Sequence, residues 1–414
     1  MLLRMSARTR VCAFYCFVFS SLIHSVNVMG QSGTITGNEF NPALSLILDG
    51  RYTDYNDAFA LPGFQLGGEA GMAPKGFSLG HSEIAMSSNI DDFFYGYTNL
   101  ALAEDDGETV VELEEAAVET SGLGNGLTIK FGKFFSGIGY LNSVHEHAHD
   151  FTDVPLVYAA MVGNHLVDSG VQIKWVAPTD LYWETGVELT RGTAYPGGES
   201  ADNNNGTAVY SKLGGDIDVS SSWQLGGFWF ATEYDARAGG EHSQVEGVEN
   251  NDGDVELYGV DMVYKWAPQG NVSERNLKIQ FEYFARDEEA TINLAQDIGD
   301  FSTDYEGSHA GYYVQSVYQF VPHWRTGLRY NWLEPDNSFK NVSENGVAFD
   351  EFLTVTALGS DEVITGVSAM VDYSRSEFSR IRLQLNQVDI GESSDTQIML
   401  QYLMSLGSHG AHKF

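Results

Sequence analysis

The sequence predicts an all-β fold, a transmembrane antiparallel β-barrel of about 16 strands with short periplasmic turns and long acidic extracellular loops. Three observations lead to this prediction. Apolar and polar residues alternate along most of the chain, short turns alternate with long loops, and the chain ends on an aromatic residue. Together these features are typical of barrels whose alternate residues face lipid.

The C-terminal stretch, 378–414, shows the alternation most clearly. Its apolar residues are spaced by two, and polar residues such as Arg380, Arg382 and Gln384 fall between them. The apolar set comprises Ile381, Leu383, Leu385, Ile398, Leu400, Tyr402, Met404 and Leu406. This spacing predicts two strands, each with one apolar face. Phe414 is in phase with the apolar set, so the last strand ends on an aromatic residue, as bacterial outer-membrane barrels do.

About 16 segments are predicted to be strands because apolar residues recur at every second position within them. The weakest is 109–118, where Glu112, Glu114 and Glu115 crowd the pattern. The others are 43–52, 76–88, 93–102, 127–131, 171–175, 181–189, 208–219, 223–233, 255–266, 277–283, 312–320, 324–332, 364–373 and the two terminal strands.

The predicted connections alternate in length. The short turns are 89–92, 121–125, 177–180, 220–222, 268–276, 321–323 and 374–377. Long, polar, acidic loops lie between them, for example 235–254, 287–308 and 335–361. This asymmetry is typical of outer-membrane barrels, and an even number of strands places both ends on the short-turn side.

Five of the seven tryptophans lie beside a predicted short turn. They are Trp175, Trp183, Trp223, Trp266 and Trp324. Because aromatic residues gather where a membrane meets water, these five predict one interfacial ring. The alternative is that they are ordinary aromatic residues of strands.

The predicted domains are a signal peptide (1–30), a short periplasmic leader (31–42) and a single outer-membrane barrel (43–414). Three arginines precede a short apolar run in the first segment, and cleavage is expected after Gly30. The alternative, one transmembrane anchor, is disfavoured because the run falls short of ~20 residues. Cys12 and Cys16 both lie in the signal, so the mature chain forms no disulfide and its stability must come from the closed sheet or its core.

The formal net charge of −35 argues against binding to nucleic acid. Without the three signal arginines, 19 basic residues remain against 57 acidic ones, a net charge of −38. Acidic runs usually lie in solvated loops. One hypothesis is that here they hold divalent cations at a lipopolysaccharide surface.

Seven basic residues are predicted to face the barrel interior because they alternate with apolar neighbours. They are Lys130, Lys174, Lys278, Arg325, Arg329, Arg380 and Arg382. One interpretation is a basic ladder that lines a water-filled pore and eases anions through it. The other is a set of lumenal salt bridges, with Glu282, Glu112 and Glu114 as the partners.

The loop 136–168 is the third on the long-loop side, and its length suggests a functional role. In general porins the third such loop folds into the barrel and narrows it. The loop contains His145, Glu146, His147, His149 and Asp150, which are types of residue that bind Zn²⁺. The alternative is a polar loop that happens to be rich in histidine. The channel itself requires no cofactor, and Zn²⁺ is the metal that this segment predicts.

The same segment contains the pattern H-E-x-x-H, in which His145 and His149 would bind zinc and Glu146 would act as the general base. That chemistry needs a helix to place both histidines on one face. The flanking Gly137 and Pro155 leave little room for one, so a protease is disfavoured. His409 and His412 are expected on the periplasmic side, away from this loop.

Several stretches resemble a group of Gram-negative outer-membrane proteins. They are 132–142 followed by His145, His147 and His149, then 113–116, 171–175, 177–180 and the ending 410–414. The group consists of porin-like barrels distantly similar to the phosphate-selective porins, and some members carry the label of zinc-regulated, TonB-dependent receptors. A TonB-dependent transporter needs a 22-stranded barrel around a plug, for which this chain is too short.

The resemblance and the residue patterns together predict a porin in the outer membrane of a Gram-negative bacterium. It would pass small hydrophilic or ionic solutes by passive diffusion and would not be an enzyme. A zinc-binding receptor or uptake protein is the alternative, and a zincin-type hydrolase is the third. The expected partners are outer-membrane lipid and lipopolysaccharide, the barrel-assembly machinery (through the strand that ends at Phe414) and two further copies of the chain in a homotrimer.

Overall fold

The structure is a computed structural model that describes residues 42–56, 60–105, 108–201, 204–238, 247–296 and 299–407. The predicted signal peptide, nearly all of the leader, Phe414 and the two tail histidines lie outside these residues. The strands are β1 (Ala43–Asp54), β2 (Gly76–Leu79), β3 (Ser82–Asn89), β4 (Phe94–Asp105), β5 (Glu108–Thr120), β6 (Leu127–Phe135), β7 (Val167–Val176), β8 (Tyr182–Thr190), β9 (Gly206–Asp218), β10 (Ser221–Ala238), β11 (Val248–Trp266), β12 (Asn276–Gln296), β13 (Gly299–Val321), β14 (Trp324–Glu334), β15 (Asn337–Asn345), β16 (Ile364–Ser376), β17 (Ser379–Ile390) and β18 (Ser393–Gly407).

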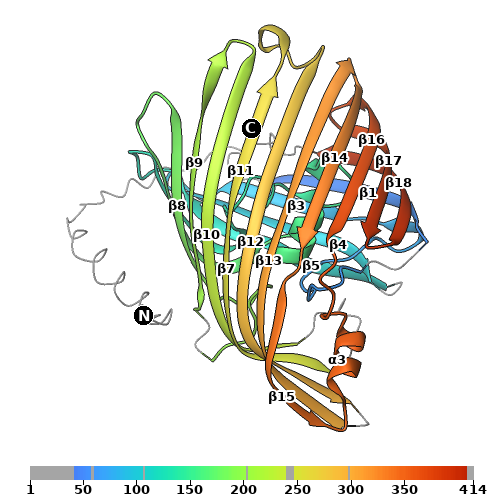
Figure 1. Cartoon of the computed structure of the whole chain (residues 1–414). Coiled ribbons are helices and arrows are strands. Elements are labelled where there is room, and N and C mark those ends of the chain that lie inside the picture. Colours follow the sequence, from blue (N-terminus) through green and yellow to red (C-terminus); the bar gives the residue numbers. More distant parts are fainter. Residues whose placement is uncertain are drawn as a thin grey trace, which may run out of the picture. The chain divides into compact units, whose positions relative to one another are not determined.

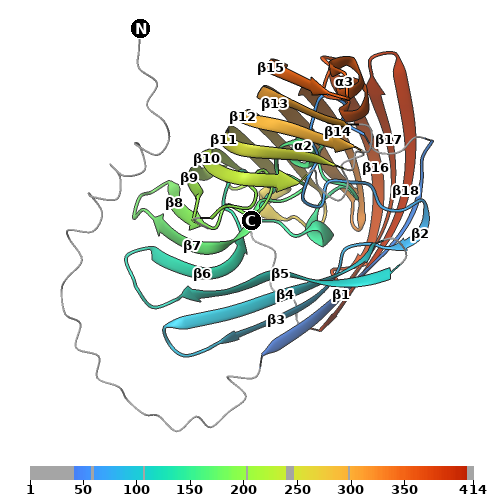
Figure 2. The same cartoon turned by 90° about the horizontal axis from the view of Figure 1, so that it is seen from below.

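These segments form one closed antiparallel sheet. The eighteen segments follow one another around the sheet in sequence order, and β18 pairs with β1 from Ser45↔Gly407 to Asp54↔Ile398. Both β2 and β3 pair with β1, and both β14 and β15 pair with β13, so each of these couples is one interrupted strand. The barrel therefore has 16 strands, as predicted (Figures 1 and 2).

The polarity of the barrel is inverted relative to that of a soluble protein. In β17, Leu383 is 43% exposed on the outside, whereas its neighbours Arg382 and Gln384 are fully buried inside. The same alternation of exposed apolar and buried polar residues recurs in β18 and β14. An apolar exterior around a polar interior is what a barrel in lipid requires.

Aromatic residues mark the two ends of the apolar exterior on β14. Trp324 lies beside the short turn and packs on Tyr373, while Trp332 stacks on Tyr312 at 5.4 Å. The two tryptophans are eight residues apart, or about 26 Å of strand at ~3.3 Å per residue. Leu328 lies midway and is 63% exposed. Because barrel strands are tilted by about 35–45°, this length spans roughly 20 Å of membrane depth, which lies within the apolar band of about 25 Å that outer-membrane barrels present to lipid.

The seven predicted short turns are present, within a few residues of their predicted bounds. The five tryptophans of the predicted ring, Trp175, Trp183, Trp223, Trp266 and Trp324, each lie within two residues of the strand end that meets such a turn. The start of β1 and the end of β18 lie on this same side, because Ser45 pairs with Gly407.

The predicted loops 235–254 and 287–308 are wrong over most of their length, because the strands continue through them. The ladder between β10 and β11 extends to Ala238↔Glu249, and that between β12 and β13 extends to Gln296↔Gly299. One face of the extended β12 is apolar, because Ala290, Ile292 and Leu294 are buried, but the run of acidic residues at 287–289 concealed this alternation. Figure 1 shows these strands extending to the end where β15 lies.

The predicted loop 335–361 also contains ordered elements. β15 pairs with the N-terminal half of β13, and helix α3 (Phe349–Thr356) follows it. Phe352 of α3 is fully buried and stacks on Phe301 of β13 at 4.3 Å. This cluster is a second apolar core beside the extended strands.

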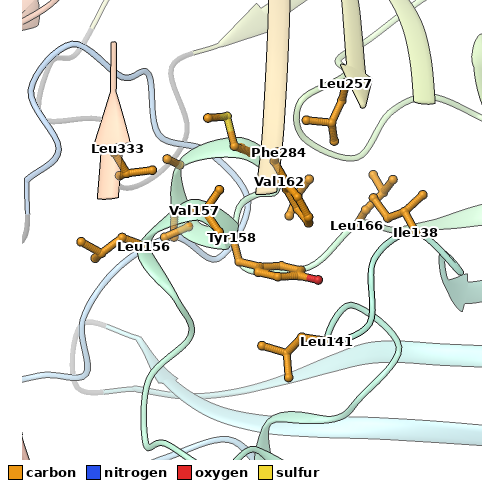
Figure 3. Packing of buried hydrophobic residues seen from close by; sticks show 14 of the residues in the cluster. Ile138, Leu141, Leu156, Val157, Tyr158, Val162, Leu166, Leu257, Phe284 and Leu333 are labelled. Atoms are coloured by element: carbon orange, nitrogen blue, oxygen red, sulfur yellow. The ribbon is translucent and has the colours of Figure 1, made fainter. Parts of the chain in front are cut away.

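The barrel interior contains an apolar core built by the connection between β6 and β7. Helix α2 (Leu156–Val162) has all its residues buried, and it contacts the inner wall at β12, β13 and β14. Figure 3 shows Tyr158 of α2 among residues of the same connection and of the wall, including Leu141 and Phe284. Leu61 and Phe64, from the segment between β1 and β2, join this core. Within the described chain, the helices are too short or too polar to cross a membrane.

The apolar exterior gives a prediction for stability. Replacing Leu328 by Arg should lower the free energy of unfolding by about 2–4 kcal/mol, because a charge at mid-depth of a barrel meets lipid. Urea unfolding of the refolded protein in lipid vesicles measures this loss. The same change at Val321, which is exposed beside the short turn, should cost only about 0–1 kcal/mol. Equal losses at the two positions would contradict the proposed depth of β14.

Candidate functional site

The seven predicted lumenal cations all lie at positions that face the barrel interior. Each alternates with outward-facing neighbours, as Lys174 does with the exposed Ile173 and Trp175. Lys174 lies 3.7 Å from Glu184, and Lys130 lies over the rings of Tyr97 and Phe134. The other five, Lys278, Arg325, Arg329, Arg380 and Arg382, all contact the inserted connection between β6 and β7.

These five residues form a basic wall on β12, β14 and β17. Asp150 of the inserted connection forms ion pairs with Lys278 and with Arg325, the latter at 2.9 Å. Burial would raise the pKa of Asp150, but these two cations hold it well below its usual range. Asp153 pairs with Arg329 at 2.6 Å in the same way. Asp372 on β16 adds a third acid, 2.6 Å from Arg325 and 3.6 Å from Arg382, so the loop and the sheet together neutralise part of the basic wall.

The acids expected to neutralise the ladder have other partners. Glu282 accepts hydrogen bonds from the backbone N–H groups of Tyr140 (2.8 Å) and Leu141 (3.1 Å) and from the Tyr158 hydroxyl (2.8 Å). Glu282 thus holds the loop rather than a cation. Glu114 contacts His81 and His145, and among the described residues no ion pair of Glu112 is found.

The histidine-rich segment lies inside the barrel, but its five predicted metal ligands do not meet at one centre. Glu146 lies 3.2 Å from Arg51, and Asp150 faces the basic wall. His149 bonds the backbone oxygen of Val144 at 2.8 Å. Only His145 and His147 face the same acidic residues, and their rings stack at 5.7 Å.

The H-E-x-x-H pattern does not adopt the arrangement of a zincin. Only a short 3₁₀ turn, η2 (Glu146–Ala148), forms here, and both His145 and His149 flank it with extended backbone. A zinc pair at i and i+4 requires a continuous helical turn. Sequence reasoning disfavoured the protease for this reason, and the geometry agrees.

The two ends of the segment differ in charge. Burial would lower the pKa of His145, but Glu114 and Glu115 raise it well above its usual value. Burial and nearby His165 lower the pKa of His149 to about 3. At neutral pH His145 is therefore charged against an acidic wall, whereas His149 is neutral beside the basic wall.

The acidic wall consists of Glu83 on β3 together with Glu114 and Glu115 on β5. All three are buried. Sequence reasoning named Glu114 only as a possible partner of the lumenal cations and did not assign Glu83 or Glu115 to a site, although the crowding of glutamates was visible. A register shift between β4 and β5 gives β5 one extra residue here, so two consecutive glutamates turn inward. The broken alternation at 112–115 was the available signal.

A polar cavity of about 70 Å³ lies between the inserted connection and the wall formed by β1, β14 and β16–β18. Arg51 and Arg329 line it from the wall, and Glu146 and Asp153 line it from the connection. Each wall arginine pairs with the facing acid, at 3.2 Å and 2.6 Å. Further wall residues are small or amide-bearing, and they include Asn331, Ser368, Asn386 and Gln397. The cavity can hold water and small ions.

The sequence matches no known family model. A curated relative, an uncharacterized protein of Aquifex aeolicus (strain VF5), is 30% identical over 366 residues, which cover 82% of this chain and 70% of the relative. The chain belongs to the same family as this Aquifex protein.

Solved structures show the same fold at low identity. A loop-deletion form of OmpT, an outer-membrane protein of Vibrio cholerae, has a TM-score of 0.54 at 11% identity and covers 89% of this chain and 100% of its own. An anion-selective porin from Comamonas acidovorans gives 0.53 at 10% identity, covering 88% and 99%. The outer-membrane channel DcaP of Acinetobacter baumannii gives 0.51 at 11% identity, covering 91% and 100%.

These neighbours confirm the porin-like fold that the resemblance implied. The label of a zinc-regulated receptor and the similarity to phosphate-selective porins stay predictions. Identity at this level concerns the fold, so the function must be argued from the interior of this barrel.

The ion pairs of Asp150 give a prediction with a definite pH dependence. Asp150→Asn should lower the free energy of unfolding by about 2–3 kcal/mol at pH 7, because Lys278 loses its acidic partner and Arg325 is left with Asp372 alone. The folded-state pKa of Asp150 is lowered, so its stabilisation is complete above the unfolded value and is lost as pH falls. The gap between wild type and variant should therefore narrow below about pH 4.

Urea unfolding in vesicles at pH 7 and pH 2 measures this gap. Glu306→Gln is the matched control, because Glu306 pairs with Lys340 where both side chains are half exposed, and such pairs add little. A gap that stays constant across the pH range would contradict the role given to the ion pairs.

Proposed function

We propose that this chain forms an outer-membrane channel through which small hydrophilic or ionic solutes diffuse passively. The observation that carries the proposal is the polar cavity between the inserted connection and the wall of β1, β14 and β16–β18. A solute there meets two arginine–carboxylate pairs and several amides, which can replace part of its hydration shell. Apolar residues such as Met72, Leu156 and Met399 line the rest of the cavity. The porin-like fold supports the same function.

The inserted connection is the constriction of the proposed channel. It is the third connection on the long-loop side, and α2 anchors it in the apolar core. Arg286, which is fully buried on β12, donates hydrogen bonds to the last carbonyls of α2, at Ala160 (3.2 Å) and Met161 (3.1 Å). These contacts support a constriction that stays in place while solutes pass.

The proposal includes the cell biology that the sequence predicted. A cleaved signal peptide directs export of the chain to the outer membrane of a Gram-negative bacterium, where the assembly machinery recognises its C-terminal strand. Lipid contacts the apolar band, and lipopolysaccharide contacts the acidic loops. A homotrimer is the proposed assembly. No step of the proposed function is catalytic.

Single-channel conductance in a planar bilayer tests the path. The sequence has no cysteine after Cys16, so Ser368→Cys places one reactive thiol on the cavity wall of the mature chain. We expect stable ohmic steps from the refolded protein. A bulky cationic thiol reagent should reduce these steps in the variant, because it narrows the cavity, and should leave the wild type unchanged.

Val367→Cys is the matched control, because Val367 is the next residue of β16 and is exposed on the outside. The reagent should leave its conductance unchanged. Absence of conductance in the wild type would overturn the channel, and equal effects at both positions would place the path elsewhere in the barrel.

Ion selectivity tests the charge pair across the cavity. Asp153→Asn leaves Arg329 without its partner, so the preference for anions should rise. Arg329→Gln leaves Asp153 unpaired, so the preference should move toward cations. Reversal potentials in a salt gradient measure both changes. Shifts of the same sign in the two variants would show that this pair does not line the path.

A further inference from the structure

A second cluster of ligand-type side chains lies at the acidic wall, away from the cavity pair. Glu83 of β3 and Glu114 of β5 are buried, and the side chain of His81, between β2 and β3, is 10% exposed. Their polar atoms lie within 4.8 Å of one another. His145 of the inserted connection adds its Nδ1 atom, 3.2 Å from Glu114 Oε2 and 3.4 Å from Glu83 Oε2. Three separate parts of the chain therefore meet here.

Local irregularities of the sheet bring these side chains inward. Between the pairs Ile47↔Glu83 and Gly50↔Leu79, β1 has two residues where the facing strand has three, and His81 is one of the three. The register shift opposite Asn99 does the same for Glu114. Such bulges re-aim single side chains and occur beside functional sites. Regular alternation would not turn Glu114 to the inner face beside Glu115.

The surroundings orient the cluster as a second coordination shell does. His145 presents Nδ1 to Glu83 and Glu114, while its other ring nitrogen, Nε2, lies 3.1 Å from Glu115. A carboxylate on the far nitrogen fixes the tautomer of metal-binding histidines. His147 Nδ1 lies 2.7 Å from the second oxygen of Glu83 and orients that carboxylate.

The spacing of the donor atoms fits a small divalent ion. Zinc bonds of about 2.0–2.2 Å in tetrahedral geometry place neighbouring ligand atoms roughly 3.3–3.6 Å apart. His81 Nε2 lies 3.0 Å from Glu114 Oε1, and His145 Nδ1 lies 3.2 Å from the other oxygen of Glu114 and 3.4 Å from Glu83 Oε2, so the Glu114 carboxylate lies between the two imidazoles. Two imidazoles and two carboxylates are a ligand set that suits Zn²⁺.

We propose that His81, Glu83, Glu114 and His145 bind one divalent transition-metal ion of the Zn²⁺ class. The ion fastens the inserted connection to β3 and β5, on the side opposite the basic wall. Of the five metal ligands predicted from sequence, only His145 is a ligand of this site. Its existence does not depend on whether the barrel conducts ions.

Metal binding to the refolded full chain tests the proposal. Equilibrium dialysis against Zn²⁺ in a detergent that keeps the barrel folded should give one ion per chain. Co²⁺ at the same site should show the intense visible absorption of a four-coordinate ion. His81→Asn and Glu83→Gln should each abolish this absorption, and Glu115→Gln should weaken binding about 10–100-fold.

Three controls make the result specific. His323→Ala removes an exposed histidine in a short turn and should leave the stoichiometry unchanged. His149→Asn distinguishes this site from the set predicted from sequence, and it should also keep the ion. The heat-modifiable mobility of each variant on gels shows whether its barrel is folded. Folded Glu115→Gln protein keeps the test valid if a ligand variant misfolds.

Two results would overturn the proposal. In the first, the wild type binds no ion, which would show that hydrogen bonds and ion pairs alone hold the four side chains together. In the second, folded His81→Asn and Glu83→Gln keep the ion while His149→Asn loses it, which would place the metal elsewhere in the loop. Either result leaves the channel proposal intact, because that proposal is read out by conductance.

Discussion

The hydrogen-bonded ladder between β1 and β18 is the constraint on which the rest of the structure depends. Lipid offers no partner to a backbone N–H or C=O group, so a sheet that crosses a membrane must close on itself. Closure assigns every second side chain to the interior. Because the exterior must be apolar, nearly all polar side chains of the spanning strands are directed inward, and Arg382 and Gln384 are fully buried for this reason. The barrel must then neutralise its own buried charges.

The connection between β6 and β7 supplies much of that neutralisation. Asp150 and Asp153 face the basic wall, and His145 faces the acidic wall. Between these charged ends, α2 packs in an apolar core inside the barrel. The connection therefore stabilises the barrel, because removing it would leave Lys278 and Arg329 without the acids that face them. A loop with these contacts is part of the folded interior of the barrel and does not merely cover the barrel opening.

Much of this architecture could be predicted from sequence because alternation with period 2 is a local signal. It gave the 16 strands, the short turns and the inward positions of the seven cations. The strands beyond the apolar band were not predicted, because acidic runs such as 287–289 concealed the alternation of the buried Ile292 and Leu294. The ion-pair partners of the lumenal cations could not be predicted from the sequence either. Arg329 and Asp153 are 176 residues apart, and only closure of the barrel brings them together.

The histidine-rich segment shows that a metal-binding composition does not ensure a metal-binding geometry. Five ligand-type residues within six positions predict a metal site only if the backbone folds them around one point. Here the segment crosses the interior between two walls of opposite charge, so its residues are sorted by wall: His145 and His147 meet glutamates, whereas Asp150 meets cations. The composition of the segment reflects this crossing. The ligand-type side chains that do converge come from distant strands. A strand pattern alone does not reveal the bulges that turn them inward.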